Sequence, residues 1–165
     1  MRISRVDPDA YDTSARSFIA AMDILLKAKT VSKERIESAQ RIADEYKTAG
    51  TKFIVTDYEG VAGVVGLMIL SDNKDEKCFK VEDVCTHPCT KGVGLALIQH
   101  AVNFSSDFGY MGKLMLTDMS GGNFYDRLGF ISSDHSIKKI LEPTRSEKWT
   151  LCEGKGFILK EYSTV

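Results

Sequence analysis

The feature that most constrains the fold is an alternating stretch that runs through a short loop with two glycines into an apolar helical pattern. Residues 81–98 read VEDVCTHPCTKGVGLALI. Strand periodicity before the loop and helical periodicity after it predict a β-strand followed directly by a helix. Such a helix commonly crosses back over the sheet, so the next strand-like stretch, Lys113–Thr117 (KLMLT), is predicted to lie parallel to the first.

The glycine loop has the features of an anion-binding site. The start of a helix presents backbone N–H groups without intrahelical partners, and the helix dipole favours negative charge there. Gly92 and Gly94 remove side chains that would keep an anion away, and Lys91 adds a positive charge. A pyrophosphate fits this description. The alternative is a plain strand-to-helix turn in which the glycines serve only sterics, because the loop matches neither G-x-x-x-x-G-K-[ST] nor G-x-G-x-x-G.

The first half of the chain predicts helices followed by an antiparallel meander. Apolar and β-branched residues predict strands over Arg2–Val6, Lys52–Tyr58, Val61–Leu70 and Cys78–Thr86. The third of these is apolar on both faces, which is typical of a central strand. Helical spacing predicts one helix that starts at Asp12 or Thr13 and buries Phe18, Met22 and Leu25, and a second from Ser32 to Gly50 with Ile36, Ala39, Ala43 and Tyr46 on one face.

The second half predicts shorter elements. The helix after the glycine loop is expected to end near Gly109 and to bury Leu97, Ala101, Phe104 and Phe108. A short helix is expected over Ser120–Leu128, then a strand from Phe130, and a closing hairpin over Trp149–Cys152 and Phe157–Tyr162. Residues 132–148 receive no assignment. The predicted fold class is α/β of the α+β type: one domain over residues 1–165, with a mixed central sheet, an antiparallel meander and helices on both faces.

Composition excludes several classes of function. The chain has 165 residues, 43% hydrophobic and 27% charged, with a net charge of −1, so no field would gather nucleic acid or an anionic membrane. The longest apolar run, Val61–Leu70, is too short to span a bilayer, and the N-terminus lacks the apolar core of a signal peptide. We therefore expect a cytoplasmic protein whose four cysteines remain thiols.

The sequence argues against a metal site. Cys85, His87 and Cys89 lie close together in the sequence, but the chain has no C-x-x-C pair. Alternation along a strand would also compete with the geometry of a tetrahedral site. We expect no metal.

A second motif identifies a family resemblance. NFYDRLGF (123–130) follows the glycine loop after one predicted helix and one predicted strand. Together the two stretches resemble the GNAT superfamily of N-acetyltransferases, which has an [RQ]-x-x-G-x-[GA] loop after its fourth strand and an F-Y-x-x-x-G-F-like segment after its fifth. CTKGVG matches the loop except that Cys89 replaces Arg or Gln, and FYDRLGF matches the second motif. VEDV also resembles the I-E-D-I strand of some members, with a shorter connection to Gly92.

The resemblance implies a fold, a cofactor and a set of contacts. The fourth and fifth strands would splay apart. Acetyl-CoA would be the acetyl donor, and an amine of a small molecule or protein would attack its thioester directly in a ternary complex. The backbone of Val84 and Thr86 would meet the pantetheine and thioester, and the loop from Cys89 to Gly94 the pyrophosphate. The implied CoA-binding positions are Val84, Cys85, Thr86, Cys89, Thr90, Lys91, Gly92, Val93, Gly94 and Asn123.

Two residues are expected to be catalytic. Tyr125 corresponds to the tyrosine that many family members place beside the CoA sulfur, where a phenol can protonate the departing thiolate; the alternative is a half-buried tyrosine packed beside Phe124. Glu82 is the expected base for the amine proton, although pairing with a neighbouring lysine on the sheet surface is equally compatible with the sequence. His87 is a third candidate for the base.

The sequence is also compatible with a protein that binds acyl-CoA without catalysis, as a sensor or an interaction domain. Cys89 and the short loop favour this interpretation, whereas Tyr125 disfavours it. The helix junction near residues 27–37 carries charges of both signs, so no class of amine acceptor stands out. The sequence does not fix the oligomeric state, and a homodimer is compatible with it.

Overall fold

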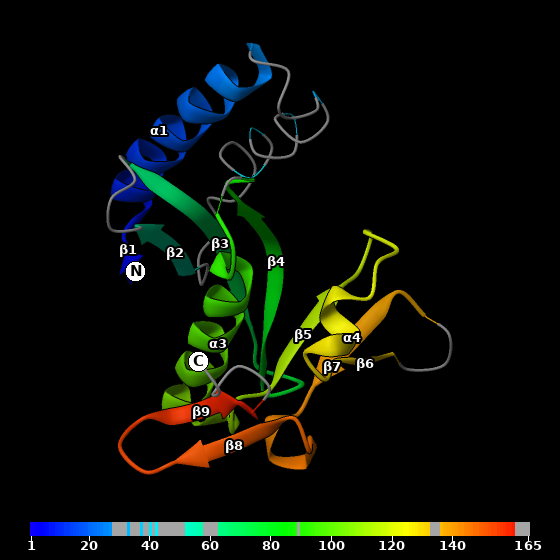
Figure 1. Cartoon of the computed structure of the whole chain (residues 1–165). Coiled ribbons are helices and arrows are strands. Elements are labelled where there is room, and N and C mark those ends of the chain that lie inside the picture. Colours follow the sequence, from blue (N-terminus) through cyan, green and yellow to red (C-terminus); the bar gives the residue numbers. More distant parts are fainter. Residues whose placement is uncertain are drawn as a thin grey trace. The chain divides into compact units, whose positions relative to one another are not determined.

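The chain forms a mixed α/β structure (Figure 1). The computed structural model describes residues 1–27, 33, 37, 40, 42, 52–57, 63–88, 90–132 and 136–160. The strands are β1 (Arg2–Val6), β2 (Lys52–Asp57), β3 (Val64–Asn73), β4 (Cys78–Thr86), β5 (Leu114–Thr117), β6 (Ile131–Ser132), β7 (Lys138–Leu141), β8 (Trp149–Cys152) and β9 (Gly156–Leu159). The helices are α1 (Pro8–Lys27), α3 (Val93–Ser105) and α4 (Phe124–Arg127).

The strands pair in the order β1-β2-β3-β4-β5-β7-β6, and β8 and β9 form a separate hairpin. Antiparallel pairs and one parallel pair, β4 with β5, make the sheet mixed, which confirms the predicted fold class. Contacts divide the chain into two compact units: the first unit is Met1–Ser71 with Asp83–Leu97, and the second unit is Asp72–Glu82 with Ile98–Val165. That the whole chain acts as one domain remains a prediction.

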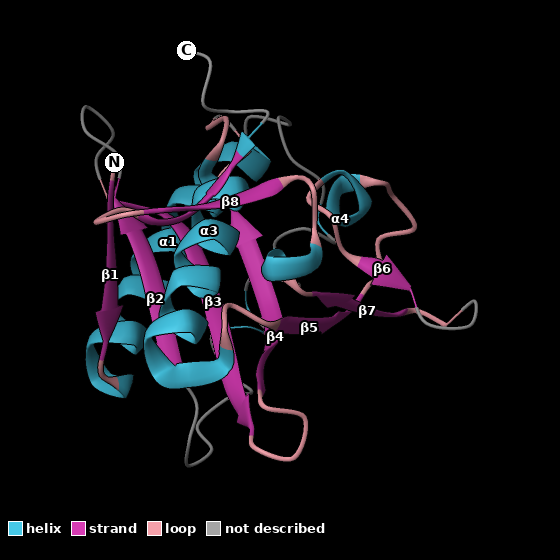
Figure 2. Cartoon of the chain, turned by 90° about the horizontal axis from the view of Figure 1, so that it is seen from below, coloured by secondary structure: helices cyan, strands magenta, loops and turns pink. Residues whose placement is uncertain are grey.

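The first unit contains β1 and the first two strands of the predicted meander, β2 and β3. β1 runs antiparallel to β2, with Arg2 opposite Asp57, and β2 runs antiparallel to β3, with Lys52 opposite Leu70. Figure 2 shows these strands side by side. β3 carries an unbroken buried run from Val65 to Leu70, as its apolar sequence predicts.

Helix α1 covers the first unit's core. It begins earlier than the predicted Asp12 or Thr13, because Asp7 accepts hydrogen bonds from Ala10 N–H at its Oδ1 (2.8 Å) and from Tyr11 N–H at its carbonyl (2.9 Å). Pro8 then occupies the first helical position, where its missing N–H is no loss. The buried cluster is Tyr11, Ala15, Phe18, Met22, Ile42, Leu67, Ile69 and Cys85.

The predicted second helix falls mostly outside the described residues. Within Ser32–Gly50, the structure describes Lys33, Glu37, Gln40 and Ile42, and all of these are helical. Lys33 Nζ lies 3.3 Å from Glu37 Oε1, the i,i+4 spacing of a helical ion pair. Ile36, Ala39, Ala43 and Tyr46 lie outside the described part.

The second unit contains the parallel pair. Phe79 and Val81 of β4 lie opposite Leu114 and Leu116 of β5, as predicted from the intervening helix. On its other edge β5 pairs with β7 in antiparallel fashion. β7 lies within the stretch left unassigned from the sequence, because Lys138 and Lys139 interrupt its apolar pattern.

An aromatic cluster closes the end of α3. The ring centroid of Phe79 lies 4.9 Å from that of Phe104 and 5.1 Å from that of Phe108. The helix passes into a π-helical turn, Ser106–Tyr110, that contains Gly109 at φ 95°. Phe108 was predicted to be buried, which is wrong: it is 49% exposed, although its ring contacts those of Phe79 and Phe104.

The closing hairpin β8-β9 is fastened to α3 by one side chain. The amide of Asn103 donates to Phe157 O at 3.0 Å, and its Oδ1 accepts from Phe157 N–H at 2.6 Å. The antiparallel pairing of β8 with β9, with Trp149 opposite Leu159, confirms the predicted hairpin, although the predicted end of its second strand, Tyr162, lies outside the described residues. Among the helices that the structure describes, none is long and apolar enough to cross a membrane.

Candidate functional site

The glycine loop of the first unit begins with a tight turn after β4. His87 N–H donates to Val65 O at 2.8 Å, and His87 O accepts from Thr90 N–H (3.1 Å) and from the Thr90 hydroxyl (2.7 Å). Cys89, predicted to contact CoA, lies outside the described residues. The turn delivers the chain to Gly92, which has φ 80° and is solvent-exposed. A Cβ there would meet no atom within 4 Å, so the glycine serves the backbone conformation and leaves the space beside it open.

Helix α3 starts directly after this glycine. Its first i,i+4 bond runs from Ala96 N–H to Gly92 O at 3.0 Å. The N–H groups of Val93, Gly94 and Leu95 precede that bond and therefore have no partner within the helix. Lys91 is exposed beside them, whereas the Val93 side chain is buried and anchors the turn. This end of α3 has the amides, the dipole and the nearby cation that an anionic group requires.

The backbone N–H and C=O groups at the end of β4 differ in whether they are open to a ligand. Val84 N–H donates to Asp83 Oδ1 at 2.9 Å, so this amide already has a partner. The Cys85 side chain packs in the buried cluster beneath α1, which leaves only its backbone for a ligand. Thr86 is half-buried at the end of the strand. The predicted backbone contacts of Val84 therefore involve its carbonyl unless the Asp83 bond opens.

Tyr125 lies in α4 of the second unit, and the glycine and final phenylalanine of the F-Y-x-x-x-G-F motif end this helix. Gly129 has φ 90° and follows Leu128, the residue that caps the C-terminus of the helix. Its N–H donates to Asp126 O and Phe130 N–H donates to Tyr125 O, both at 3.1 Å. These two bonds form a Schellman motif, which needs glycine in the left-handed position and often adds an apolar contact. That contact is present: the ring centroids of Phe130 and Tyr125 lie 5.6 Å apart.

The predicted helix over Ser120–Leu128 is wrong in its first half, since only Phe124–Arg127 is helical. Ser120 instead donates its N–H (2.9 Å) and its hydroxyl (2.6 Å) to Asp118 Oδ1, and Gly121 has φ 64°. Asn123, predicted to contact CoA, precedes α4 and is exposed, and its side chain makes no capping hydrogen bond.

Glu82 has a cationic neighbour on its own strand. Lys80 Nζ lies 2.6 Å from Glu82 Oε2, and the Glu82 side chain is 18% exposed. This is the lysine pairing that the sequence left open as an alternative. Tyr125 and Glu82 both belong to the second unit, whereas the predicted CoA-binding residues other than Asn123 belong to the first.

A buried charged cluster lies where β5 ends. Lys139 Nζ lies 2.8 Å from Asp118 Oδ2 and 2.5 Å from Asp126 Oδ1. Burial would raise the pKa of Asp118, but hydrogen bonds from Lys139 and Ser120 outweigh it and hold the pKa below its usual value. Hydrogen bonds to Asp118 and then Asp126 raise the pKa of Lys139. Asp118 and Lys139 are therefore both charged at neutral pH.

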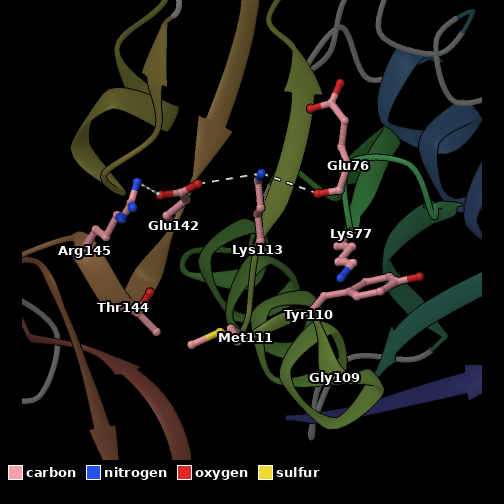
Figure 3. Close-up of a pocket in the computed structure, with 9 residues that line it drawn as sticks. All are labelled: Glu76, Lys77, Gly109, Tyr110, Met111, Lys113, Glu142, Thr144 and Arg145. Carbon is pink, nitrogen blue, oxygen red and sulfur yellow. Dashed lines mark hydrogen bonds and ion pairs between the residues drawn. The ribbon is translucent and has the colours of Figure 1, made fainter.

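The second unit also has a pocket of about 420 Å³ near the start of β5. Figure 3 shows Lys113 in its centre, between Glu142 and Glu76, with the Glu76 carboxylate turned away. Lys113 Nζ lies 3.6 Å from Glu142 Oε1 and 3.4 Å from Glu76 O. None of the residues predicted to be functional lines this pocket.

Asp118, Lys139, Lys148 and Trp149 were not predicted from the sequence. The last two donate hydrogen bonds to the C-terminal end of α4. No local pattern in the sequence indicated any of the four, and Lys139 lies in the unassigned stretch. Among the residues that the structure describes, no group of three or more His, Cys, Asp or Glu side chains is arranged to hold a metal ion.

Comparisons with known proteins agree with this architecture. The Acetyltransferase (GNAT) family matches residues 18–130. A GNAT family acetyltransferase from Brucella melitensis, solved with acetyl-CoA, is 18% identical, with 86% of each chain covered and a TM-score of 0.56. The PaiA N-acetyltransferase from Thermoplasma acidophilum, solved with coenzyme A, is 17% identical, with 85% of this chain and 97% of that chain covered and a TM-score of 0.53.

A third similar structure is Tetrahymena GCN5, 10% identical, with 85% of this chain and 94% of that chain covered and a TM-score of 0.56. At these identities the structures show a shared fold. Comparison with curated protein sequences gives no match. Because the family match spans more than half of the sequence, this chain belongs to the GNAT acetyltransferase family.

Proposed function

We propose that this protein is an N-acetyltransferase that binds acetyl-CoA and transfers its acetyl group to an amine. The observation that carries the proposal is the open left-handed Gly92 at the start of α3, next to amides that have no intrahelical partner and to Lys91. This geometry suits the pyrophosphate of a CoA molecule. Two similar structures were solved with acetyl-CoA and coenzyme A, which supports this ligand.

The proposed contacts follow the chain. Thr90, Lys91, Gly92, Val93 and Gly94 would bind the pyrophosphate, with Cys89 beside them. The backbone of Val84, Cys85 and Thr86 would meet the pantetheine and thioester, and Asn123 is a further proposed CoA contact. An N–H directed at the thioester oxygen would stabilise the negative charge that develops on it during attack.

The proposed reaction is a direct transfer. A neutral amine attacks the thioester carbonyl, a C–N bond forms and the C–S bond breaks. The Tyr125 hydroxyl donates a proton to the departing CoA thiolate, and Glu82 accepts the proton that the amine loses, directly or through water. Glu82 then releases its proton to solvent, and the Tyr125 phenolate takes one up, so both residues return to their starting forms. The amine belongs to a small molecule or a protein.

The experiment that tests this function measures two signals in parallel. Thiol release from acetyl-CoA is followed while candidate amines are added, and thermal shift is followed with CoA alone. Amine-dependent thiol release supports the transferase. If CoA shifts the melting temperature but no thiol is released from acetyl-CoA, with or without amines, the result favours a non-catalytic acyl-CoA sensor. The sequence feature that supports this alternative is Cys89 in place of Arg or Gln.

A further inference from the structure

The helix that carries Tyr125 is too short to hold its own position. α4 spans Phe124–Arg127, four residues, whereas isolated helices shorter than about 12 residues are marginal in water. Asn123, at its N-terminus, makes no side-chain cap. The position of α4 therefore depends on contacts with other parts of the second unit.

The C-terminal end of α4 is held by two residues near the start of β8. Lys148 Nζ donates to Asp126 O at 3.1 Å and to Arg127 O at 2.8 Å. Trp149 Nε1 donates to Leu128 O at 2.7 Å. The bonds to Arg127 O and Leu128 O satisfy carbonyls at the C-terminal end of the helix, Asp126 O accepts from Lys148 in addition to Gly129 N–H, and the lysine complements the negative end of the helix dipole.

Lys139 ties the helix to β5. Its Nζ contacts both Asp126 Oδ1 in α4 and Asp118 Oδ2 just beyond β5, and the Lys139 and Asp118 side chains are only 10% and 4% exposed. The other oxygen of Asp118 binds Ser120, in the segment that leads into α4. One buried carboxylate thus fixes both the lysine and the approach to the helix. Figures 1 and 2 show α4 beside β6 and β7, where Lys139 lies.

The Lys139–Asp118 pair is buried and adds little net stability, since desolvation offsets the attraction, but it holds the lysine where its Nζ also reaches the half-exposed Asp126. Asp126 directly follows Tyr125, so a shift of one moves the other. We infer that Lys139, through its ion pair with Asp126, is a positioning residue that holds the Tyr125 hydroxyl in place for acetyl transfer. This inference rests on the proposed function, because it needs Tyr125 to act on the thiolate.

The test removes the Asp126 side of this bridge and leaves the buried pair intact. Asp126 is 52% exposed, so Asp126→Ala should fold, whereas Lys139→Met would leave Asp118 buried without a counter-ion. The matched control is Glu76→Ala, which breaks the ion pair of Lys138, the neighbour of Lys139 on β7, at 2.8 Å. Glu76 makes no contact with α4 among the described interactions.

Two readouts are measured in both variants. Amide hydrogen exchange at Gly129 and Phe130, whose N–H groups bind Asp126 O and Tyr125 O, should become roughly 10-fold faster in Asp126→Ala and stay unchanged in Glu76→Ala. Turnover of Asp126→Ala should fall roughly 10-fold with an almost unchanged KM for acetyl-CoA. In a Tyr125→Phe background, Asp126→Ala should lower turnover no further, because the two changes act on one group.

The outcomes distinguish a failure of this inference from a failure of the proposed function. Unchanged exchange in Asp126→Ala overturns the anchoring of α4 by Lys139. A turnover loss that persists in the Tyr125→Phe background overturns the action through Tyr125. Absence of transfer by the wild-type protein overturns the proposed function, and the exchange measurement then decides the anchoring of α4 by itself.

Discussion

Phe130 contacts Tyr125 through both backbone and ring: its N–H donates to Tyr125 O at 3.1 Å, and the two rings meet edge to face with centroids 5.6 Å apart. Gly129, between the end of α4 and Phe130, makes this contact possible with its left-handed backbone. The glycine and the final phenylalanine of the F-Y-x-x-x-G-F motif therefore set the orientation of the tyrosine.

The first prediction concerns Gly129. Gly129→Ala should lower the free energy of unfolding by roughly 2 kcal/mol, because φ is 90° and the new Cβ would lie 2.7 Å from Ser146 Oγ. Urea unfolding measures the change. The control is Gly121→Ala, which also has positive φ but whose Cβ meets nothing within 4 Å, so its loss should be smaller. Equal losses in the two variants would show that Ser146 does not crowd the site.

The second prediction concerns the Tyr125 hydroxyl. Tyr125→Phe keeps the ring in contact with the rings of Phe124 and Phe130, so the melting temperature should change little. Turnover should fall about 10²-fold, since the thiolate loses its proton donor, while CoA affinity changes much less. Tyr110→Phe is the control: its hydroxyl binds Asp72 at 2.8 Å, and turnover should not change. Wild-type turnover in Tyr125→Phe would remove the residue from the mechanism.

The third prediction separates the two interpretations of Glu82. If Glu82 accepts the amine proton, Glu82→Gln should lower turnover by roughly 10-fold or more near neutral pH, whereas Lys80→Met should keep most of it. If Glu82 serves only as the partner of Lys80, at 2.6 Å, both variants should turn over as the wild type does. Steady-state rates at saturating acetyl-CoA give the answer, and the second pattern contradicts our proposal.

The fourth prediction concerns the pH dependence of stability. The pKa of Asp118 is lowered in the folded protein, so its contribution is present above the unfolded pKa of about 3.9 and is lost as pH falls through the folded value. The pKa of Lys139 is raised, so its contribution is complete below about 10.4 and is lost only as pH rises through the folded value. The contribution of the cluster to the free energy of unfolding should therefore be nearly constant between about pH 3.9 and about pH 10.4.

Asp118→Asn tests this pH dependence. At pH 7 the variant should lose about 2 kcal/mol of unfolding free energy, because Lys139 and Ser120 lose a charged acceptor. The difference from the wild type should shrink as the pH is lowered towards about 3. Urea unfolding across this range measures it, and a difference that stays constant would mean that the Asp118 carboxylate is not the titrating group.

Much of the fold was predictable because its main elements follow strong local rules. Alternation indicated β4, the apolar run indicated β3, and the helix between β4 and β5 implied their parallel pairing. The start of α1 was missed although Asp7-Pro8 is a capping signal, and Phe108 was misplaced because spacing does not show how much of a side chain at the end of a helix is covered. β7 escaped because its lysines are paired by carboxylates distant in sequence.

The motifs of the candidate site were also found from the sequence, and the roles of their residues remain predictions. The glycine loop and Tyr125 were found from motifs, and the structure shows a local cause for both. The bridge of Lys139 between Asp118 and Asp126 was out of reach, because it depends on which segments the tertiary fold brings together.

The most direct test of the central claim is calorimetric titration with acetyl-CoA of the wild type, Gly92→Gln and Gly92→Glu. Both variants place a side chain of similar size at a backbone with φ 80°, so they share the steric and conformational cost. Only the glutamate adds a negative charge where the pyrophosphate should bind. We predict one acetyl-CoA bound per wild-type chain, weaker binding to Gly92→Gln and none to Gly92→Glu. No binding to the wild type at millimolar acetyl-CoA, or equal binding to all three proteins, would contradict the account.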